Sequence, residues 1–492
     1  MFFIIFLGFV LVLLYLYITQ NFDYWKKRGI SYLEPSFPFG NIFPLVTFKK
    51  SYADLMAQIY NSSKESIVGY WIFNIPFLLI RSPELIKNIF VRDFDHFSDR
   101  VSSSIKIDPF VEKALFCLDF HDWKILRSKL SPSFTTSKLK NVMHIFNQSS
   151  NEMVEYLDEV SGDAVDCKLI SSRLTANVFA GWIFGYKINC FKDVDNEFFV
   201  YSHKLLEPTV ANFIRFVGVF VMPEIATFFK VNMFKKRDLD FYRRHFWKSV
   251  NLREESGVNN NDLIDCYVQL NKEGDLGDGF TLDEDSLSGL AIQFFLAGYE
   301  TTSSLISFTL YELAMNEDIQ QKLRHEIFDS LAVEEDGNFS YENIIDLSYL
   351  NKVISESLRK YPTLPLIERK CVKDYQIPGT KIIIEKGTKC QFSPIGLHHD
   401  PEFFPNPDIF DPERFSPENV KTRPPYVYMP FGHGPHNCIG KKFGLLTAKI
   451  CIAQILTNFQ ILPTESTPKR IEIDSIMFLI KPKDVFLKFV KL

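Results

Sequence analysis

Residues Phe431 to Gly440 read FGHGPHNCIG and deliver one cysteine, Cys438, among three glycines and a proline. The glycines can take backbone conformations closed to other residues and Pro435 stiffens the chain, so the pattern predicts a shaped turn. From Ile439 onward apolar residues recur at helical spacing, which places Cys438 just before a helix. Free N–H groups and the positive end of the helix dipole favour a thiolate there, and a thiolate can bind a metal. A buried structural cysteine is the ordinary alternative.

The composition limits the kinds of partner. The chain has 492 residues, of which 46% are hydrophobic and 23% charged, and this balance is typical of a globular protein with a large core. Its net charge of -5 and pI of about 6.1 predict no nucleic-acid partner. Eight cysteines are scattered without a CxxC pattern, which indicates reduced thiols in a cytosol-facing protein.

The N-terminus predicts a membrane anchor. Phe2 to Ile18 is a run of 17 uncharged, mostly apolar residues, or about 25 Å of helix, which is adequate for an endoplasmic-reticulum bilayer. The basic cluster at 26–28 follows it, so the positive-inside rule puts the rest of the chain in the cytosol. A cleaved signal peptide is the alternative, but its basic n-region and small-residue cleavage site are missing. We divide the chain into an anchor (1–20), a basic stop and Pro-rich hinge (21–41) and one body (42–492).

The first half of the body contains a strand pair and a helix with two possible anion donors. Ser66 to Ile80 alternates aromatic and aliphatic residues around a break, which predicts a hairpin. A helix opens near His121 and carries Trp123 and Arg127 one turn apart, so both can donate to one anionic group. A cation–π or surface pair is the alternative.

A long helix is predicted after Thr281-Leu282-Asp283-Glu284, which has the spacing of a capping box, and it continues past Leu313. Within it, the residues Ala297 to Thr302 are poor helix formers. Ala297 and Thr301 share one face with Glu300 on its flank, so a small residue, a hydroxyl and an acid could serve the chemistry of bound oxygen. A threonine that bonds back to the helix carbonyl is the alternative.

Three charged residues form a candidate buried ion cluster. Glu356 and Arg359 lie at i,i+3 on a helix that ends before Tyr361, and Arg414 is the candidate third partner. A surface pair is the alternative, because Glu-x-x-Arg is frequent by chance. Arg369 follows an apolar stretch and is a candidate anion-binding residue.

Together, and in this order along nearly the whole chain, these motifs resemble the cytochrome P-450 superfamily of haem-thiolate monooxygenases. The resemblance implies a mainly α fold with small β-sheets (α+β), in which a helical domain carries a long central helix over the haem and follows one N-terminal transmembrane helix. Glu356, Arg359 and Arg414 match the family's structural ion triad. Sequence details, including Arg359 to Pro362 and Glu368 to Cys371, are most similar to insect microsomal members that metabolise xenobiotics.

The resemblance also implies the chemistry. Cys438 would be the axial thiolate of the iron of haem b, and Thr301 and Glu300 would deliver protons. One oxygen atom from O2 would enter a hydrophobic small molecule, either a xenobiotic or an endogenous lipid or hormone, and the other would leave as water. The residues implied to contact the haem are Trp123, Arg127, Ala297, Arg369, Phe431, His436, Cys438 and Gly440.

The implied setting is the endoplasmic reticulum membrane, with a single-pass anchor and a cytosolic catalytic body in contact with lipid. Electrons would come from NADPH through cytochrome P-450 reductase, with cytochrome b5 as a further donor. The basic residues that would attract the reductase's acidic surface are Lys124, Lys129, Lys441 and Lys442, with ordinary solvated lysines as the alternative. The predicted substrate pocket is lined by Ile105 to Phe116, Phe213 to Phe220, Phe294, and Leu364 to Ile367.

One residue departs from the family pattern. His436 stands two residues before the cysteine, where the family almost always has an arginine that donates to a haem propionate. An arginine is always charged and forked, whereas a histidine is mostly neutral at pH 7 and offers one donor. We hypothesise a weaker but functional haem site.

Two alternatives come from other classes of protein. His433, His436 and Cys438 are metal-type ligands within six residues and suggest a structural zinc module, although no fourth ligand is obvious. The second alternative is a haem-thiolate protein that binds or rearranges ligands without activating oxygen. The presence of both Glu300 and Thr301 argues against it. The sequence does not identify the substrate.

Overall fold

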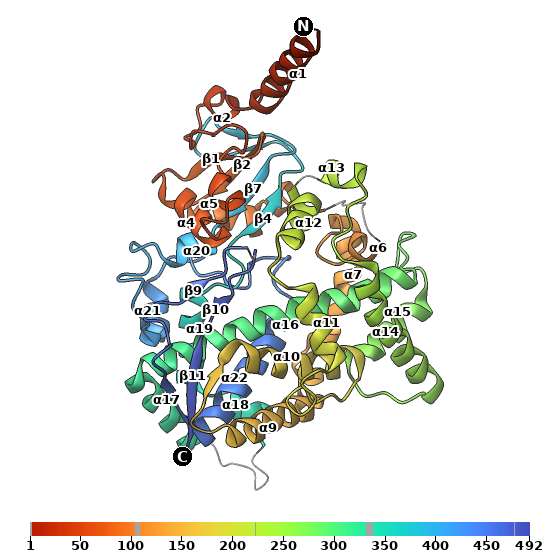
Figure 1. The fold of residues 1–492 in the computed structure, drawn as a ribbon, viewed down its shortest axis with the longest axis vertical. Helices are drawn as coiled ribbons and strands as arrows, with labels where there is room; N and C mark the ends of the chain where they lie inside the picture. Colours follow the sequence, from red (N-terminus) through yellow and green to blue (C-terminus); the bar gives the residue numbers. More distant parts are fainter. Residues whose placement is uncertain (1, 104–108, 222, 331–337, 477) are drawn as a thin grey trace.

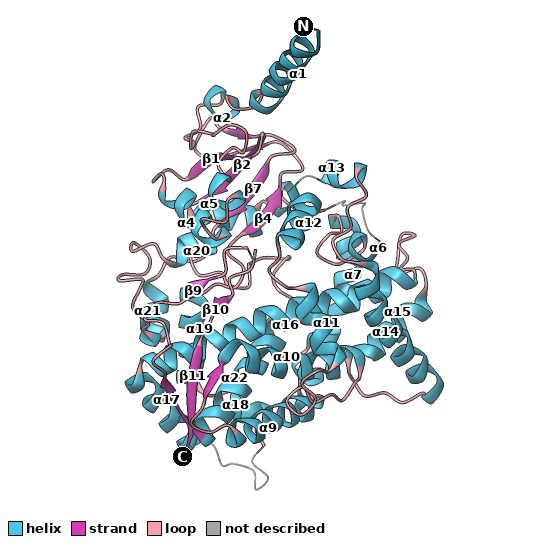
Figure 2. Cartoon of the chain, viewed as in Figure 1, coloured by secondary structure: helices cyan, strands magenta, loops and turns pink. Residues whose placement is uncertain are grey.

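The computed structural model describes residues 2–103, 109–221, 223–330, 338–476 and 478–492. Helices make up most of the body, and the strands gather into small sheets (Figure 2). One hydrophobic core of buried residues extends from Trp25 to Phe489. The predicted α+β fold, mainly helical with small sheets, is confirmed.

The N-terminal helix α1 (Phe2–Thr19) projects from the body (Figure 1). None of its residues is buried, its mean hydropathy is 2.7, and it is long and apolar enough to cross a membrane. The segment after it packs against the body. Trp25, in α2 (Tyr24–Lys27), is 2% exposed, and Arg28 forms two hydrogen bonds of 2.8 Å with the carboxylate of Glu385. The Asn74 side chain also donates to the Tyr17 carbonyl at the end of α1.

A four-stranded sheet forms the part of the body next to the anchor, in the order β1 (Ile67–Ile72), β2 (Ile75–Ile80), β7 (Lys389–Phe392) and β4 (Ile367–Lys370). Strands β1 and β2 pair antiparallel as the predicted hairpin. Strand β4 pairs antiparallel with β7, with Arg369 opposite Cys390. The sheet thereby fixes the backbone of Arg369. Helices α3 (Phe43–Val46), α4 (Tyr52–Asn61) and α5 (Pro83–Lys87) accompany it.

Helix α16 (Glu284–Met315) crosses the middle of the molecule, where α10 (Cys167–Phe184) packs along it (Figure 1). Its N-cap is Asp283, whose carboxylate accepts from the Ser286 N–H at 2.8 Å. The predicted capping box beginning at Thr281 is therefore wrong by two residues.

Gly298 explains the weak helix formers in α16. A Cβ on Gly298 would lie 2.1 Å from the ring of Phe179 on α10. Real Cβ atoms do not approach a ring this closely, so only glycine allows the two helices to touch at this point.

The remaining helices surround this pair. They are α6 (Pro109–Glu112), α7 (Phe120–Leu130), α8 (Thr136–Asn141), α9 (Met143–Glu159), α11 (Glu197–Leu205), α14 (Lys236–Ser256), α15 (Leu263–Glu273), α17 (Glu317–Ser330), α18 (Tyr341–Ile345), α19 (Ser348–Lys360), α20 (Pro394–His398), α21 (Pro417–Thr422) and α22 (Lys441–Asn458). Short 3-10 or π-helical turns are η1 (Asn88–Arg92), η2 (Phe94–His96), η3 (Ser131–Phe134) and η4 (Pro412–Phe415). The further sheets are formed by β3 (Ala164–Asp166) with β11 (Phe486–Lys491) and β8 (Phe459–Pro463), by β9 (Glu472–Ile473) with β10 (Pro482–Lys483), and by β5 (Tyr375–Gln376) with β6 (Ile383–Ile384).

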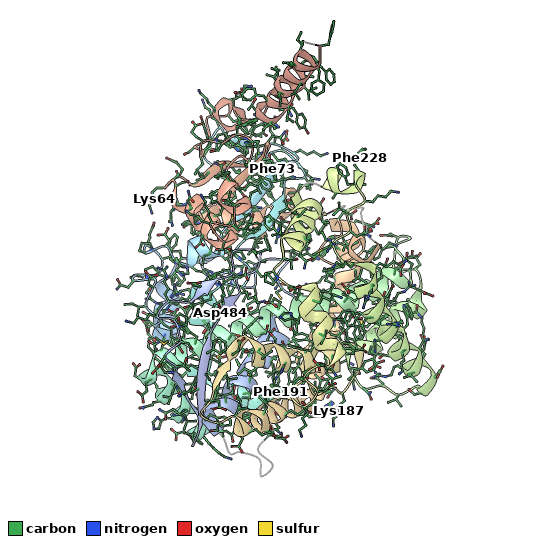
Figure 3. The ribbon with its side chains drawn as sticks, viewed as in Figure 1. Lys64, Phe73, Lys187, Phe191, Phe228 and Asp484 are labelled. Atoms are coloured by element: carbon green, nitrogen blue, oxygen red, sulfur yellow. The ribbon has the colours of Figure 1, made fainter. Side chains whose placement is uncertain are left out.

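Two apolar helices, α12 (Val210–Val221) and α13 (Pro223–Phe228), lie toward the same end of the body as the sheet (Figure 1). They carry exposed apolar side chains. Ile214 is 60% exposed, and Phe228, labelled in Figure 3, is 81% exposed, next to Phe229 at 69%. This end therefore presents an unusual amount of apolar surface.

Candidate functional site: the cysteine loop and the groups around it

The cysteine loop, residues 431–440, is a tight turn. The Cys438 N–H donates to the Phe431 carbonyl at 2.9 Å. Gly434 has a φ of 70°, and a Cβ there would lie 2.0 Å from the Phe90 carbonyl oxygen, so this position requires glycine. Helix α22 begins three residues after Cys438, with Gly440 as its N-cap. The predicted turn and the helix that follows are confirmed.

The thiol of Cys438 combines accessible surface with protein on all sides. Cys438 is exposed, yet burial raises the pKa of its thiol, against the backbone N–H groups of Gly440 and Lys441 and the charge of Arg127. A group that lines an internal space has both properties. The N–H groups are present as expected, but they do not outweigh burial. A bound metal cation would favour the thiolate over the thiol at this position.

His436, two residues earlier, faces inward. Its Nε2 lies 2.6 Å from the carbonyl oxygen of Ser98, and its ring centroid lies 3.9 Å from that of Trp123. Burial, followed by the charges of Arg100 and Arg369, lowers the pKa of His436 to about 2. The ring is therefore neutral at pH 7.

Two buried arginines lie beside this loop. Arg369 is 2% exposed and Arg100 is 8% exposed. Within the described part of the chain each guanidinium hydrogen-bonds only to a backbone carbonyl, of Glu368 at 2.7 Å and of Phe116 at 3.5 Å respectively. Burial lowers the pKa of Arg100 to about 10, while Glu368 opposes this effect. The pKa of Arg369 is also lowered, by burial and by the charge of Arg100.

Sequence reasoning missed Arg100. No local pattern marks this residue, because its importance comes from contacts with elements far away in the chain. A charged residue in the segment before a predicted pocket wall (105–116) was the only available signal.

Trp123 and Arg127 of α7 both lie against the cysteine loop. Trp123 is 4% exposed, and its indole Nε1 has no hydrogen-bond partner in the part of the chain that the structure describes. Arg127 donates to the Asn437 side chain of the cysteine loop at 3.0 Å. The Arg369 Nε and His436 Nδ1 atoms are likewise buried without a partner among the described residues. Buried polar atoms are nearly always hydrogen-bonded, so this cluster of unpartnered atoms indicates a site for a polar or anionic ligand.

These residues fit a haem. Two buried guanidiniums that bind no carboxylate of the described residues, together with the indole N–H, suit two propionates, and an accessible thiol suits the iron. On α16, Ala297 is exposed although most of the helix is buried, so a flat group has room beside it. Phe431, also predicted to contact the haem, is half-buried at the start of the loop.

The acid and the alcohol of α16 face different surroundings. The Thr301 hydroxyl is hydrogen-bonded to the Ala297 carbonyl at 2.7 Å, which is the helix back-bond considered as an alternative above. The Glu300 carboxylate is 2.9 Å from the ammonium of Lys168 on α10, and the Ser304 hydroxyl donates to it at 3.4 Å. The structure therefore does not bring Glu300 together with Thr301.

The Glu300–Lys168 pair is buried. Burial alone would raise the pKa of Glu300, but the charges of Lys168 and Lys481 outweigh it and the pKa falls below its ordinary value. Burial lowers the pKa of Lys168 to about 8, against the attraction of Glu300. Glu300 is therefore an anion at pH 7. Sequence reasoning missed Lys168, which lies on another helix.

Glu356, Arg359 and Arg414 are brought together. The Glu356 carboxylate accepts from the Arg359 guanidinium at 2.7 and 2.8 Å, and Arg414 Nε lies 3.3 Å from it. Glu356 and Arg359 are fully buried. Arg359 also donates to the carbonyls of His398 and Pro407, so the cluster connects α19 to the segment that leads to the cysteine loop.

The predicted pocket segments are partly described. Residues 105–108 lie outside the described residues. The Phe116 and Phe220 rings are 6.5 Å apart, so two of the predicted segments meet. Ile367 approaches the cysteine loop, 3.9 Å from the Cβ position of Gly432. Phe294 instead packs against Phe134, with ring centroids 5.6 Å apart.

The zinc alternative lacks its ligands. Across residues 2–103, 109–221, 223–330, 338–476 and 478–492, no group of three or more His, Cys, Asp or Glu side chains could hold a metal ion. His433 and His436 bond instead to the backbone carbonyls of Tyr428 and Ser98.

Comparison with known proteins agrees with the geometry. The family described as Cytochrome P450 matches residues 32–489. Cytochrome P450 6k1 of Blattella germanica is 36% identical, over 99% of this chain and 97% of its own length. Cytochrome P450 9e2 of the same species is 36% identical (95% and 93%), and probable cytochrome P450 6g2 of Drosophila melanogaster is 35% identical (97% and 96%). All three are insect proteins, as the sequence details predicted. The chain belongs to the cytochrome P450 family and is a haem-thiolate monooxygenase.

Proposed function

We propose that the protein inserts one oxygen atom from O2 into a hydrophobic small molecule, a xenobiotic or an endogenous lipid or hormone, with electrons from NADPH delivered by cytochrome P-450 reductase. The accessible thiol of Cys438 beside buried, unpartnered donors is the observation that carries the proposal. We also propose the endoplasmic reticulum as its location, with α1 as the single-pass anchor and the body in the cytosol.

The haem, when bound, supplies the oxygen chemistry, and the protein's own groups hold and shield it. Cys438 would provide the thiolate that holds the iron. Trp123, Arg127, Arg369 and, in addition to the residues predicted from sequence, Arg100 provide donors and positive charge for the propionates. Ala297 leaves room on the opposite face, and the apolar ring contact between Phe116 and Phe220 contributes to the wall around the substrate.

Proton delivery falls to Thr301 and Glu300. The Thr301 hydroxyl keeps its hydrogen bond with Ala297 and still offers an oxygen lone pair to a water or substrate. Glu300 is an anion stabilised by Lys168 and can accept a proton there and pass it on after a side-chain rotation.

Electrons would enter on the face that carries Cys438. Lys124, Lys441 and Lys442 are exposed there, and Lys129 is partly neutralised by Glu273 at 2.6 Å. Exposed lysines attract an acidic partner and raise its rate of association at low salt. Cytochrome b5 would use the same face.

The test is product formation from a panel of hydrophobic candidates, with purified protein, reductase and NADPH. Candidates are first selected by the change that they cause in the haem absorption spectrum. Cys438→Ser removes the thiolate, and we expect it to abolish both turnover and the carbon monoxide spectrum typical of haem-thiolate proteins. Cys266→Ser, at a half-buried cysteine outside the site, is the control and keeps both. Turnover by Cys438→Ser would refute the assignment.

One observation favours a second candidate, a haem-thiolate protein that binds or rearranges ligands without activating oxygen. The Glu300 carboxylate is bound to Lys168 and not to Thr301. Product formation with and without NADPH and reductase separates the two candidates. The second candidate would form product without NADPH and reductase, or would form no product even with them despite a normal carbon monoxide spectrum.

A further inference from the structure

The hydrogen bond of His436 fixes the position of its proton. A carbonyl oxygen can only accept, so the Nε2 atom that lies 2.6 Å from the Ser98 oxygen must carry the hydrogen. That leaves Nδ1 as the one ring nitrogen that can face a ligand, where arginine would offer a fork of donors. Nδ1 is buried and has no hydrogen-bond partner among the described residues. His436 therefore does not replace the forked donor that arginine supplies at this position in the family.

The His436 ring is held in place by its neighbours and connects the segment 98–100 to the cysteine loop. It lies between Trp123, at 3.9 Å between centroids, and Phe94, at 5.3 Å, and it is 7% exposed. Its partner Ser98 belongs to the segment 98–100, which runs between three elements. The Asp99 carbonyl accepts from Lys370 N of β4 at 2.8 Å, and the Asp99 carboxylate accepts from Phe120 N of α7 at 3.0 Å. The bond to His436 ties the same segment to the cysteine loop.

The segment 98–100 ends at Arg100, whose guanidinium is a buried cation. The Arg100 N–H donates to the Ser103 hydroxyl at 3.0 Å, which holds the backbone, and the side chain is 8% exposed. Among the described residues its guanidinium forms one long hydrogen bond, to the Phe116 carbonyl at 3.5 Å, and it stacks on the Phe116 ring at 4.7 Å. Arg100 is two residues from Ser98, the residue bonded to His436, and its charge helps to lower the pKa of both His436 and Arg369.

We propose that His436 is a positioning residue that locks the segment 98–100 onto the cysteine loop, so that Arg100 provides the buried positive charge that the loop itself lacks. The inference rests on the haem site proposed above. It changes the expected consequence of the missing arginine: haem retention depends on the Nε2–H bond to Ser98 and on Arg100, and a charge at position 436 is not required.

Two neutral variants separate this role from direct contact with the haem. In His436→Gln the side-chain N–H2 lies about where Nε2 was and can still reach Ser98, whereas in His436→Asn it lies about where Nδ1 was and cannot. The readout is the rate at which the purified holoprotein loses haem to excess apomyoglobin, together with the haem content per protein chain. We expect His436→Gln to resemble the native protein and His436→Asn to lose haem about tenfold faster, since a buried hydrogen bond is lost.

A double variant tests the route through Arg100. If His436 acts by holding Arg100, Arg100→Gln accelerates haem loss, and adding His436→Asn to it has little further effect. Additive effects would overturn the proposal. The reverse order of the two position-436 variants, with Asn native-like and Gln impaired, would mean that Nδ1 contacts the haem directly and would also overturn it.

The failure of the wider assignment is distinguishable. A native protein without haem would contradict the haem site itself, whereas a haem-loaded protein in which Gln and Asn behave alike would contradict only the role of His436. Far-UV circular dichroism of each variant checks that the fold is kept. If His436→Asn does not fold, the haem-loss rates of the other two variants still test the proposal. Faster haem loss from His436→Gln, or an unchanged rate of haem loss from Arg100→Gln, would overturn it.

Discussion

Gly298 shows how strongly one side chain can constrain the central helix. Its missing Cβ leaves room for the rigid ring of Phe179 on α10. We predict that Gly298→Ala lowers the free energy of unfolding by about 1–3 kcal/mol, because overpacking at the contact outweighs the better helix propensity of alanine. Urea unfolding followed by circular dichroism measures the loss. Gly298→Ala combined with Phe179→Leu should recover part of it, and a single variant as stable as the native protein would contradict the explanation.

Lys168 is the second residue whose replacement has a defined effect. Lys168→Met leaves the Glu300 carboxylate buried without its counter-ion, which should cost about 3 kcal/mol of unfolding free energy at pH 7 and raise the pKa of Glu300. A protonated Glu300 does not need the ammonium, so the deficit relative to the native protein should shrink as pH falls toward 4. Urea titrations at several pH values measure it. Lys168→Arg keeps a cation and is the control; a deficit independent of pH would argue for lost packing alone.

At the residue scale, the sequence indicated the groups that lie in motifs but not their partners. Cys438, Trp123 and Arg127 could be predicted because helix spacing and turn chemistry are local properties. Arg100 and Lys168 could not, because a cation becomes buried only when segments distant in the sequence meet. The same limit applied to Glu300, whose place on the flank of α16 was predicted while its counter-ion on α10 was not.

Among the elements, helix α20 contributes a histidine that must stay neutral. The His398 ring is fully buried, and its Nε2 accepts from the Met429 N–H at 3.0 Å. Burial lowers the pKa of His398 well below its ordinary value of 6.5, with His399 and Arg359 acting in the same direction. The unfolded chain therefore takes up a proton at His398 that the folded chain does not bind. The free energy of unfolding decreases as the pH falls below 6.5.

We predict that this histidine contributes about 1.4 kcal/mol per pH unit to the loss of stability between pH 6 and pH 4.5. His398→Gln can still accept from Met429 but does not titrate, so its unfolding free energy should depend less steeply on pH by this amount. Urea unfolding at each pH measures the slope. His325→Gln, at an exposed histidine of α17, is the matched control for replacing a histidine by glutamine. Equal slopes for native protein and His398→Gln would contradict the prediction.

Element boundaries followed local signals where these were strong. The predicted helix before Tyr361 is α19, which ends at Lys360, and the hairpin between Ser66 and Ile80 is β1 and β2. The start of α16 was wrong by two residues because Thr281 and Asp283 are both good caps, and only the folded structure selects between them. Pairing of β2 with β7, more than 300 residues later, had no local signal.

For the whole molecule, the apolar surface of α12 and α13 predicts a second contact with lipid besides the anchor. A chain without residues 2–20 should still bind phospholipid vesicles, because Ile214, Phe228 and Phe229 are exposed. Replacing both phenylalanines with serine in the truncated chain should weaken binding about tenfold or more in a vesicle sedimentation assay. Exposed Val420→Ser, on α21, is the control. Unchanged binding of the double variant would place the lipid contact elsewhere.

The contacts of Arg28 and Asn74 near the end of α1 have a consequence for how hydrophobic substrates reach the enzyme. Arg28 with Glu385 fixes the segment after α1 to the body, and the Asn74 side chain donates to the Tyr17 carbonyl at the end of α1, so side-chain contacts restrict the tilt of the body relative to α1. A body held at one tilt keeps the same face against the bilayer at every encounter. Hydrophobic compounds would then arrive by lateral diffusion, at a concentration set by their partition into lipid. The apparent KM, expressed as total substrate per volume of buffer, should consequently rise as more phospholipid is added at a constant amount of protein.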